Sequence, residues 1–148
     1  MTGPGPTTPI SLPEFAAAAS VHDQGPGRIQ AQVSTGGQDF PADEPIEAGG
    51  GGTGPSPHDL LAAGLAACTT MTLRLYADRK TWPLERIHVV VDHVRQPDAA
   101  PPDLFRRRVV LTGPLDEGQR ERLMQIADRC PVHRTLVAGA RIETATGG

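Results

Sequence analysis

The stretch GPSPHDLLAAGLAAC, residues 54–68, decides the fold because a sharp helix start leads into a run of small apolar residues. Ser56 suits the N-cap, Pro57 the first helical position and Asp59 the third, a capping-box-like arrangement. The periodicity predicts a helix over 57–79. Small side chains let another backbone approach closely, so we expect a central helix covered on several sides. Its predicted contact stripe comprises Leu60, Gly64, Ala67, Cys68, Met71 and Leu75.

Beyond this helix the chain predicts a hairpin, a second helix and a closing strand. Residues 87–95 and 104–112 are rich in β-branched side chains and bounded by Pro, Asp and Gly, as hairpin strands are. Residues 116–130 have helical spacing, with Cys130 at the end of the helix and Pro131 stopping it. Residues 139–144 alternate like a short final strand.

The segment before the helix predicts strands preceded by an arm. Residues 28–34 alternate as a half-buried strand, and residues 38–47 suggest another that Pro41 and Pro45 weaken. We expect residues 1–26 to be a loose N-terminal arm and residues 27–148 to form a single domain. The order of strands, helix, hairpin, helix and strand is typical of an α+β fold.

Composition excludes several classes of function. The chain has 148 residues, 38% hydrophobic and 21% charged, with a net charge of −3, which gives no general electrostatic reason to bind nucleic acid. No run approaches the ~20 apolar residues needed to cross a bilayer, and the N-terminus does not resemble a signal peptide. We therefore expect a cytoplasmic protein that binds neither nucleic acid nor membrane, in a compartment where thiols stay reduced.

The two cysteines are the main candidates for chemistry. A reactive cysteine needs a nearby cation or helix dipole, since the thiolate is the nucleophile. Cys68 lies eleven positions after Pro57, too far along its helix for the dipole to act (68 − 57 = 11). Cys130, at a helix C-terminus, would meet a dipole that opposes ionisation. This asymmetry predicts that Cys68 attacks and Cys130 resolves; the alternative is that both are small buried hydrophobes.

Other polar residues give weaker signals. A zinc site from Cys68, Cys130, His58 and His133 would need four clustered ligands, and no pair has a CxxC or HxxxH spacing, so we expect no metal. The remaining histidines are more often found on surfaces or strand faces. Residues 106–108 are three arginines that would point alternately to the two faces of a strand, with at least one in solvent.

The motif at residues 54–68 resembles the OsmC/Ohr family, the osmotically inducible protein C and organic hydroperoxide resistance proteins. The resemblance continues through 71–84 and resumes at Ala127-Asp128-Arg129-Cys130-Pro131-Val132-His133. It covers roughly residues 27–145, and the two cysteine motifs occur in order, 62 positions apart (130 − 68).

The resemblance implies a fold, an assembly and an activity. The fold is α+β, with two central helices against curved antiparallel sheets, in an intertwined homodimer with sites at the subunit interface. The activity is thiol-dependent reduction of organic hydroperoxides in oxidative stress defence, without a cofactor. Cys68 would become a sulfenic acid and then form a disulfide with Cys130, which a dithiol such as dihydrolipoamide reopens. The alternative is a non-catalytic binding protein using the pocket around Cys68.

Two positions depart from the family pattern. Where family peroxidases carry a Glu after the helix cap, this chain has His58, followed by Asp59; where they carry an Arg on an early strand-turn, it offers Gln38. The sequence is thus closer to the branch that lacks the Arg–Glu pair, and His58, Arg28 or Arg134 would have to supply the cation. We expect His58, Asp59 and Gln38 to line or support the pocket, and the Cα atoms of the two cysteines to lie within about 7 Å.

Overall fold

The structure is a computed structural model that describes residues 18–147. The chain divides into two compact units, residues 1–54 with 141–148, and residues 55–140, and each is described by itself. A single domain over residues 27–148 stays a prediction. The arm expected at residues 1–26 contains a strand, Ala19–Asp23, while residues 1–17 lie outside the described part.

The first unit holds a three-stranded antiparallel sheet in the order β1 (Ala19–Asp23), β2 (Ala31–Thr35), β3 (Gln38–Ala42). Gly36 and Gly37 form the tight turn between β2 and β3, and both adopt positive φ, 57° and 75°, as a two-residue hairpin loop requires. Pro41 is accommodated because β3 lies at the edge of this sheet. The strands predicted around 28–34 and Phe40 are therefore present, whereas Ile46 belongs to a short 3-10 helix, η2 (Ile46–Ala48).

A buried carboxylate organises the loop that follows. Asp43 is only 4% exposed, and it accepts hydrogen bonds from the backbone N–H groups of Glu44, Gly51 and Thr53. The Thr53 hydroxyl donates a further bond of 2.6 Å. A Cβ at Gly50 would collide with the Glu44 carbonyl oxygen, so glycine is required at this close approach. The Thr53 hydroxyl, more than any other partner, holds the pKa of Asp43 below its usual value.

Replacing Asp43 by Asn is expected to destabilise the chain at neutral pH and to weaken its acid sensitivity. A lowered folded-state pKa means that Asp43 contributes stability above its unfolded pKa of about 3.9, and this contribution is lost as pH falls through the folded value. Thermal unfolding between pH 3 and 7 measures it. Asp98→Asn, at an exposed loop position, is the control; equal pH slopes for both variants would contradict the prediction.

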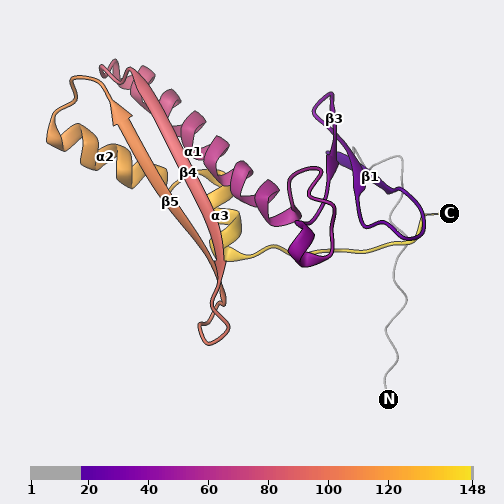
Figure 1. Cartoon of the computed structure of the whole chain (residues 1–148). Coiled ribbons are helices and arrows are strands. Elements are labelled where there is room, and N and C mark those ends of the chain that lie inside the picture. The colour runs from indigo at the N-terminus through magenta and orange to yellow at the C-terminus, as the bar shows by residue number, and fades with distance from the viewer. Residues whose placement is uncertain (1–17, 148) are drawn as a thin grey trace. The chain divides into compact units, whose positions relative to one another are not determined.

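The second unit packs helices against a long hairpin, and Figure 1 shows α1 running alongside it. Its elements are α1 (Pro57–Lys80), β4 (Arg86–Arg95), β5 (Asp103–Thr112), α2 (Glu117–Ala127) and α3 (Pro131–Ala138). The strands pair antiparallel from Arg86↔Thr112 to Arg95↔Asp103, which confirms the predicted hairpin. Side chains from helices α1 and α2, with one from the link before β4, form the core: Leu73, Ala77, Leu84, Leu123, Ile126 and Ala127.

The buried face of α1 differs from the predicted contact stripe. The residues that are buried are Ala62, Leu65, Thr69, Leu73 and Ala77. By contrast, Met71 is 65% and Leu75 56% exposed in the single chain. The residues of α1 are small and apolar on most sides of the helix. The helical periodicity of the sequence therefore could not show which side faces the core.

The second predicted helix is two helices. α2 ends at Ala127, and Cys130 is the N-cap of α3 rather than the last residue of a helix. Pro131 occupies the first helical position of α3, where its missing N–H costs nothing, so it starts a helix instead of stopping one. The strand predicted at 139–144 is also absent: residues 139–147 have no regular secondary structure.

Within residues 18–147, α1 is the helix long and apolar enough to span a membrane by length and composition alone. The core helix of a soluble protein meets the same two criteria. α1 is therefore an unusually apolar helix, and the single chain leaves Leu61, Met71 and Leu75 on it exposed.

Candidate thiol site

Cys130 is fully buried at the start of α3, where backbone geometry presents a donor to its sulfur. The backbone N–H of His133 donates to Sγ at 3.3 Å, as a side-chain N-cap does. The Thr69 hydroxyl lies 3.9 Å from the same sulfur. The helix N-terminus places positive potential here, opposite to the field expected from the sequence, so the dipole argument for assigning roles to the two cysteines was wrong.

Arg107 is a largely buried cation in this region. Its side chain is 12% exposed and reaches in from β5, where its N–H groups donate to the Thr69 hydroxyl at 3.1 Å and the Ala127 carbonyl at 3.2 Å. A third bond, of 2.8 Å, goes to the Asp128 carboxylate. Arg107 therefore ties β5 to α1 and to the turn before Cys130. Neither Arg107 nor Thr69 was among the predicted site residues.

The alternation of inward and outward side chains along β5 could have identified Arg107 from the sequence. Phe105, Val109 and Leu111 pack inward from β5, and Arg107 shares their face, whereas Arg106 and Arg108 point to the other side. Arg106 there pairs with Asp92 and lowers the pKa of that carboxyl. Aligning the three arginines with the apolar positions would have selected Arg107.

Cys68 is half-buried on α1 and lies next to Thr69 in the sequence. At about 100° per residue, Leu61, Gly64, Cys68, Met71 and Leu75 fall within an arc of about 80°. Cys68 thus lies on the uncovered apolar face of α1, while Thr69 points inward to Cys130. Both cysteines are free thiols, and their predicted Cα separation stays a prediction.

The remaining predicted site residues lie apart from Cys68 or in the other unit. Ser56 and Asp59 form the predicted capping box, with bonds of 3.0 and 3.1 Å, so Asp59 stabilises the start of α1. His58 and Cys68 share this continuous helix ten positions apart, about 15 Å along its axis, and make no contact within one chain. Gln38 begins β3 in the first unit, paired with Thr35, and Arg28 belongs to the same unit.

An apolar pocket of about 320 Å³ opens beside the two cysteine segments. It lies within the second unit, and its walls come from α1, β5, the link before β5, and α3. The lining residues are Leu65, Pro101, Asp103, Leu104, Phe105, His133, Leu136 and Val137. Neither cysteine lines this pocket, but Leu65 precedes Cys68 by one helical turn, and the backbone N–H of His133 donates to Cys130.

An α+β unit that carries two free thiols on adjoining helices, one half-buried and one enclosed, defines a two-cysteine thiol protein. The model of the OsmC-like protein family matches residues 49–145, and the chain belongs to that family. No curated protein matches the chain.

Solved structures show the same fold. An OsmC-like protein from Mycoplasma pneumoniae is 20% identical, with a TM-score of 0.64 over 80% of this chain and 84% of that one. The organic hydroperoxide resistance protein OsmC from Legionella pneumophila is 25% identical, with a TM-score of 0.61 over 86% and 91%. The organic hydroperoxide resistance protein OhrB of Bacillus subtilis is 24% identical, with a TM-score of 0.58 over 82% and 90%. The predicted α+β fold and family are thereby confirmed.

Proposed function

We propose that this protein is a cysteine-based peroxidase that reduces organic hydroperoxides in oxidative stress defence. The observation that carries the proposal is the presence of a half-buried thiol on α1 and an enclosed thiol at the start of α3, with an apolar pocket lined by residues of both helices. Similarity to organic hydroperoxide resistance proteins supports the substrate class.

The proposed reaction has two steps. The Cys68 thiolate attacks the distal oxygen of ROOH, the O–O bond breaks, and the products are the Cys68 sulfenic acid and, after protonation, the alcohol ROH. The Cys130 thiol then attacks the Cys68 sulfur, which forms a disulfide and releases water. A dithiol such as dihydrolipoamide reduces this disulfide, restores both thiols and itself becomes oxidised.

The division of roles rests on exposure. Hydroperoxide must reach the attacking sulfur, and Cys68 is the half-buried thiol, whereas Cys130 is fully buried behind Thr69. Cys130 does not have to be reached by the hydroperoxide, because in the proposed reaction it reacts only with the oxidised Cys68. The predicted assignment of Cys68 as peroxidatic and Cys130 as resolving is kept, on accessibility rather than on helix dipoles.

The test is a single-turnover titration of the reduced full-length chain. One equivalent of cumene hydroperoxide is expected to consume two thiols and to give one cumyl alcohol, with peptide mapping locating an intramolecular Cys68–Cys130 disulfide. Loss of no thiol would overturn the peroxidase proposal and leave the non-catalytic binding protein. Loss of two thiols through a disulfide between chains would overturn the resolving role of Cys130.

We also propose a homodimer that covers the exposed apolar face of α1. Leu61, Met71 and Leu75 are 46%, 65% and 56% exposed, and Cys68 lies on the same face. Such a stripe is costly in water, because each exposed large apolar side chain forgoes roughly 1.5–3 kcal/mol of burial. A second copy would cover it and place Cys68 beside an interface. We further propose a cytoplasmic location, where both thiols stay reduced.

The substitution Met71→Glu with Leu75→Glu is expected to convert the dimer into a monomer. Two charges on the apolar stripe would have to be desolvated in the interface, so association should weaken by at least a hundredfold. Light scattering at micromolar concentration measures the mass. Lys80→Glu, exposed on α1 but about 100° around the helix from this stripe, is the control and should remain dimeric; a monomeric wild-type chain would contradict the dimer itself.

A further inference from the structure

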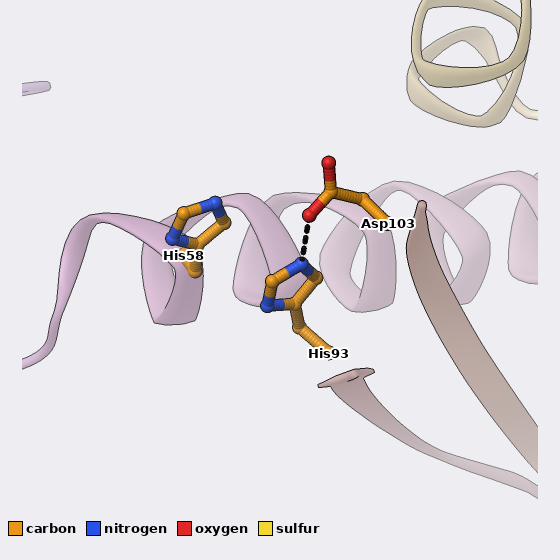
Figure 2. A group of neighbouring side chains, drawn as sticks. All are labelled: His58, His93 and Asp103. Carbon is orange, nitrogen blue, oxygen red and sulfur yellow. Dashed lines mark hydrogen bonds and ion pairs between the residues drawn. The ribbon is translucent and has the colours of Figure 1, made fainter. Parts of the chain in front are cut away.

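A second group of chemically competent side chains lies where the first turn of α1 meets the end of the hairpin that the 96–102 connection closes, and one member, Asp103, also lines the apolar pocket. His58 comes from α1, His93 from β4 and Asp103 from the first position of β5 (Figure 2). The two imidazole rings are stacked in parallel, with centroids 4.3 Å apart and planes inclined by 7°. The group belongs to the second unit, and His58 lies about 15 Å along the axis of α1 from Cys68.

The potential ligand atoms already converge. One ring nitrogen of each histidine and one carboxylate oxygen of Asp103 all lie within 4.8 Å of one another. Figure 2 shows the carboxylate of Asp103 directed at the His93 ring, and Nε2 of His93 lies 2.9 Å from Oδ1. Two ligands of a tetrahedral zinc ion, with bonds of ~2.0–2.1 Å, are about 3.3 Å apart. To bind zinc, the distance between His93 Nε2 and Asp103 Oδ1 therefore needs to increase only slightly, and the side chain of His58 needs to rotate toward the ion.

The surroundings preorganise two of the three ligands and leave a route for the ion. Phe105 packs against the His93 ring, with centroids 4.9 Å apart, and Arg95 bonds to both carboxylate oxygens of Asp103 at 3.3 Å. The His93 side chain is 17% exposed and that of Asp103 39%. His58 is exposed in the first turn of α1, so an ion can reach the group from solvent on that side.

We propose that His58, His93 and Asp103 bind a divalent transition-metal ion of the zinc class, with a fourth position open to water. The ion takes the place of the hydrogen bond between His93 Nε2 and Asp103 Oδ1, and any proton held between these two atoms leaves to solvent. Imidazole nitrogen selects zinc, cobalt or nickel over magnesium and calcium, which prefer all-oxygen ligand sets. This ligand set shares only His58 with the four-ligand set considered from the sequence.

The test is calorimetric titration of the full-length chain with zinc chloride, in a Cys68→Ser/Cys130→Ser background so that thiols cannot supply ligands. One ion per chain is expected, with cobalt(II) giving the ligand-field absorption of a tetrahedral or five-coordinate site and magnesium giving no heat. His93→Gln should weaken zinc binding by at least tenfold. His58→Gln, an exposed substitution that leaves the sheet untouched, should do the same.

His88→Gln is the matched control, because His88 projects from the other face of β4. It should bind zinc as tightly as the background does. Absence of saturable zinc binding, or equal affinity in His58→Gln, His93→Gln and His88→Gln, would overturn the proposal. Because both cysteines are absent from the background, either result leaves the peroxidase proposal intact.

Discussion

Cys68→Ser is expected to lower the rate of cumene hydroperoxide consumption by at least about a thousandfold, as removal of a catalytic nucleophile does. A serine hydroxyl is not ionised at neutral pH and cannot form the sulfenic acid on which the second step depends. The measurement is peroxide consumption with dihydrolipoamide in excess. Thr72→Ser, one turn further along α1 and half-buried like Cys68, is the matched control and should retain full activity.

Cys130→Ser separates the two steps. This variant should consume about one equivalent of hydroperoxide and then stop or slow, with a sulfenic acid on Cys68 that dimedone traps. Trapping on Cys130 in the Cys68→Ser variant would reverse the roles, since it would show that the enclosed thiol reacts first. Full activity in Cys68→Ser would contradict the proposed function.

Arg107→Leu is expected to cost about 2–3 kcal/mol of unfolding free energy. The substitution leaves the Thr69 hydroxyl and the Ala127 carbonyl without their donor at a site that is largely closed to water, and it removes the ion pair with Asp128. For a chain of this size the melting temperature should fall on the order of 5–10 °C. Chemical denaturation with urea measures the free energy, and Arg107→Lys should recover part of it through a single contact.

The neighbouring arginine provides the control. Arg108 is exposed on the opposite face of β5, so Arg108→Leu should change stability by less than about 0.5 kcal/mol. Arg107→Leu should also slow closure of the Cys68–Cys130 disulfide, because Arg107 fixes Thr69 and the turn before Cys130. Equal stability and equal closure rates for the two leucine variants would show that Arg107 plays no part in this region.

Local sequence signals determined much of the second unit. Ser56, Pro57 and Asp59 fix the start of α1 through groups within one helical turn, so the capping box was predictable without tertiary contacts. The β-branched runs at 87–95 and 104–112 likewise specify β4 and β5, whose pairing needs only a short connection. The two cysteine motifs identified the family for the same reason: each is a contiguous run of residues.

Tertiary structure decided which faces these elements use. α1 is apolar nearly all round, so only its packing on β4 shows that Thr69 points inward and Cys68 lies on the uncovered side. Pro131 suits both the end of one helix and the start of the next, and only the fold shows that Cys130 begins α3. Arg107 and the His58–His93–Asp103 group depend on residues far apart in the chain, whose proximity no local pattern encodes.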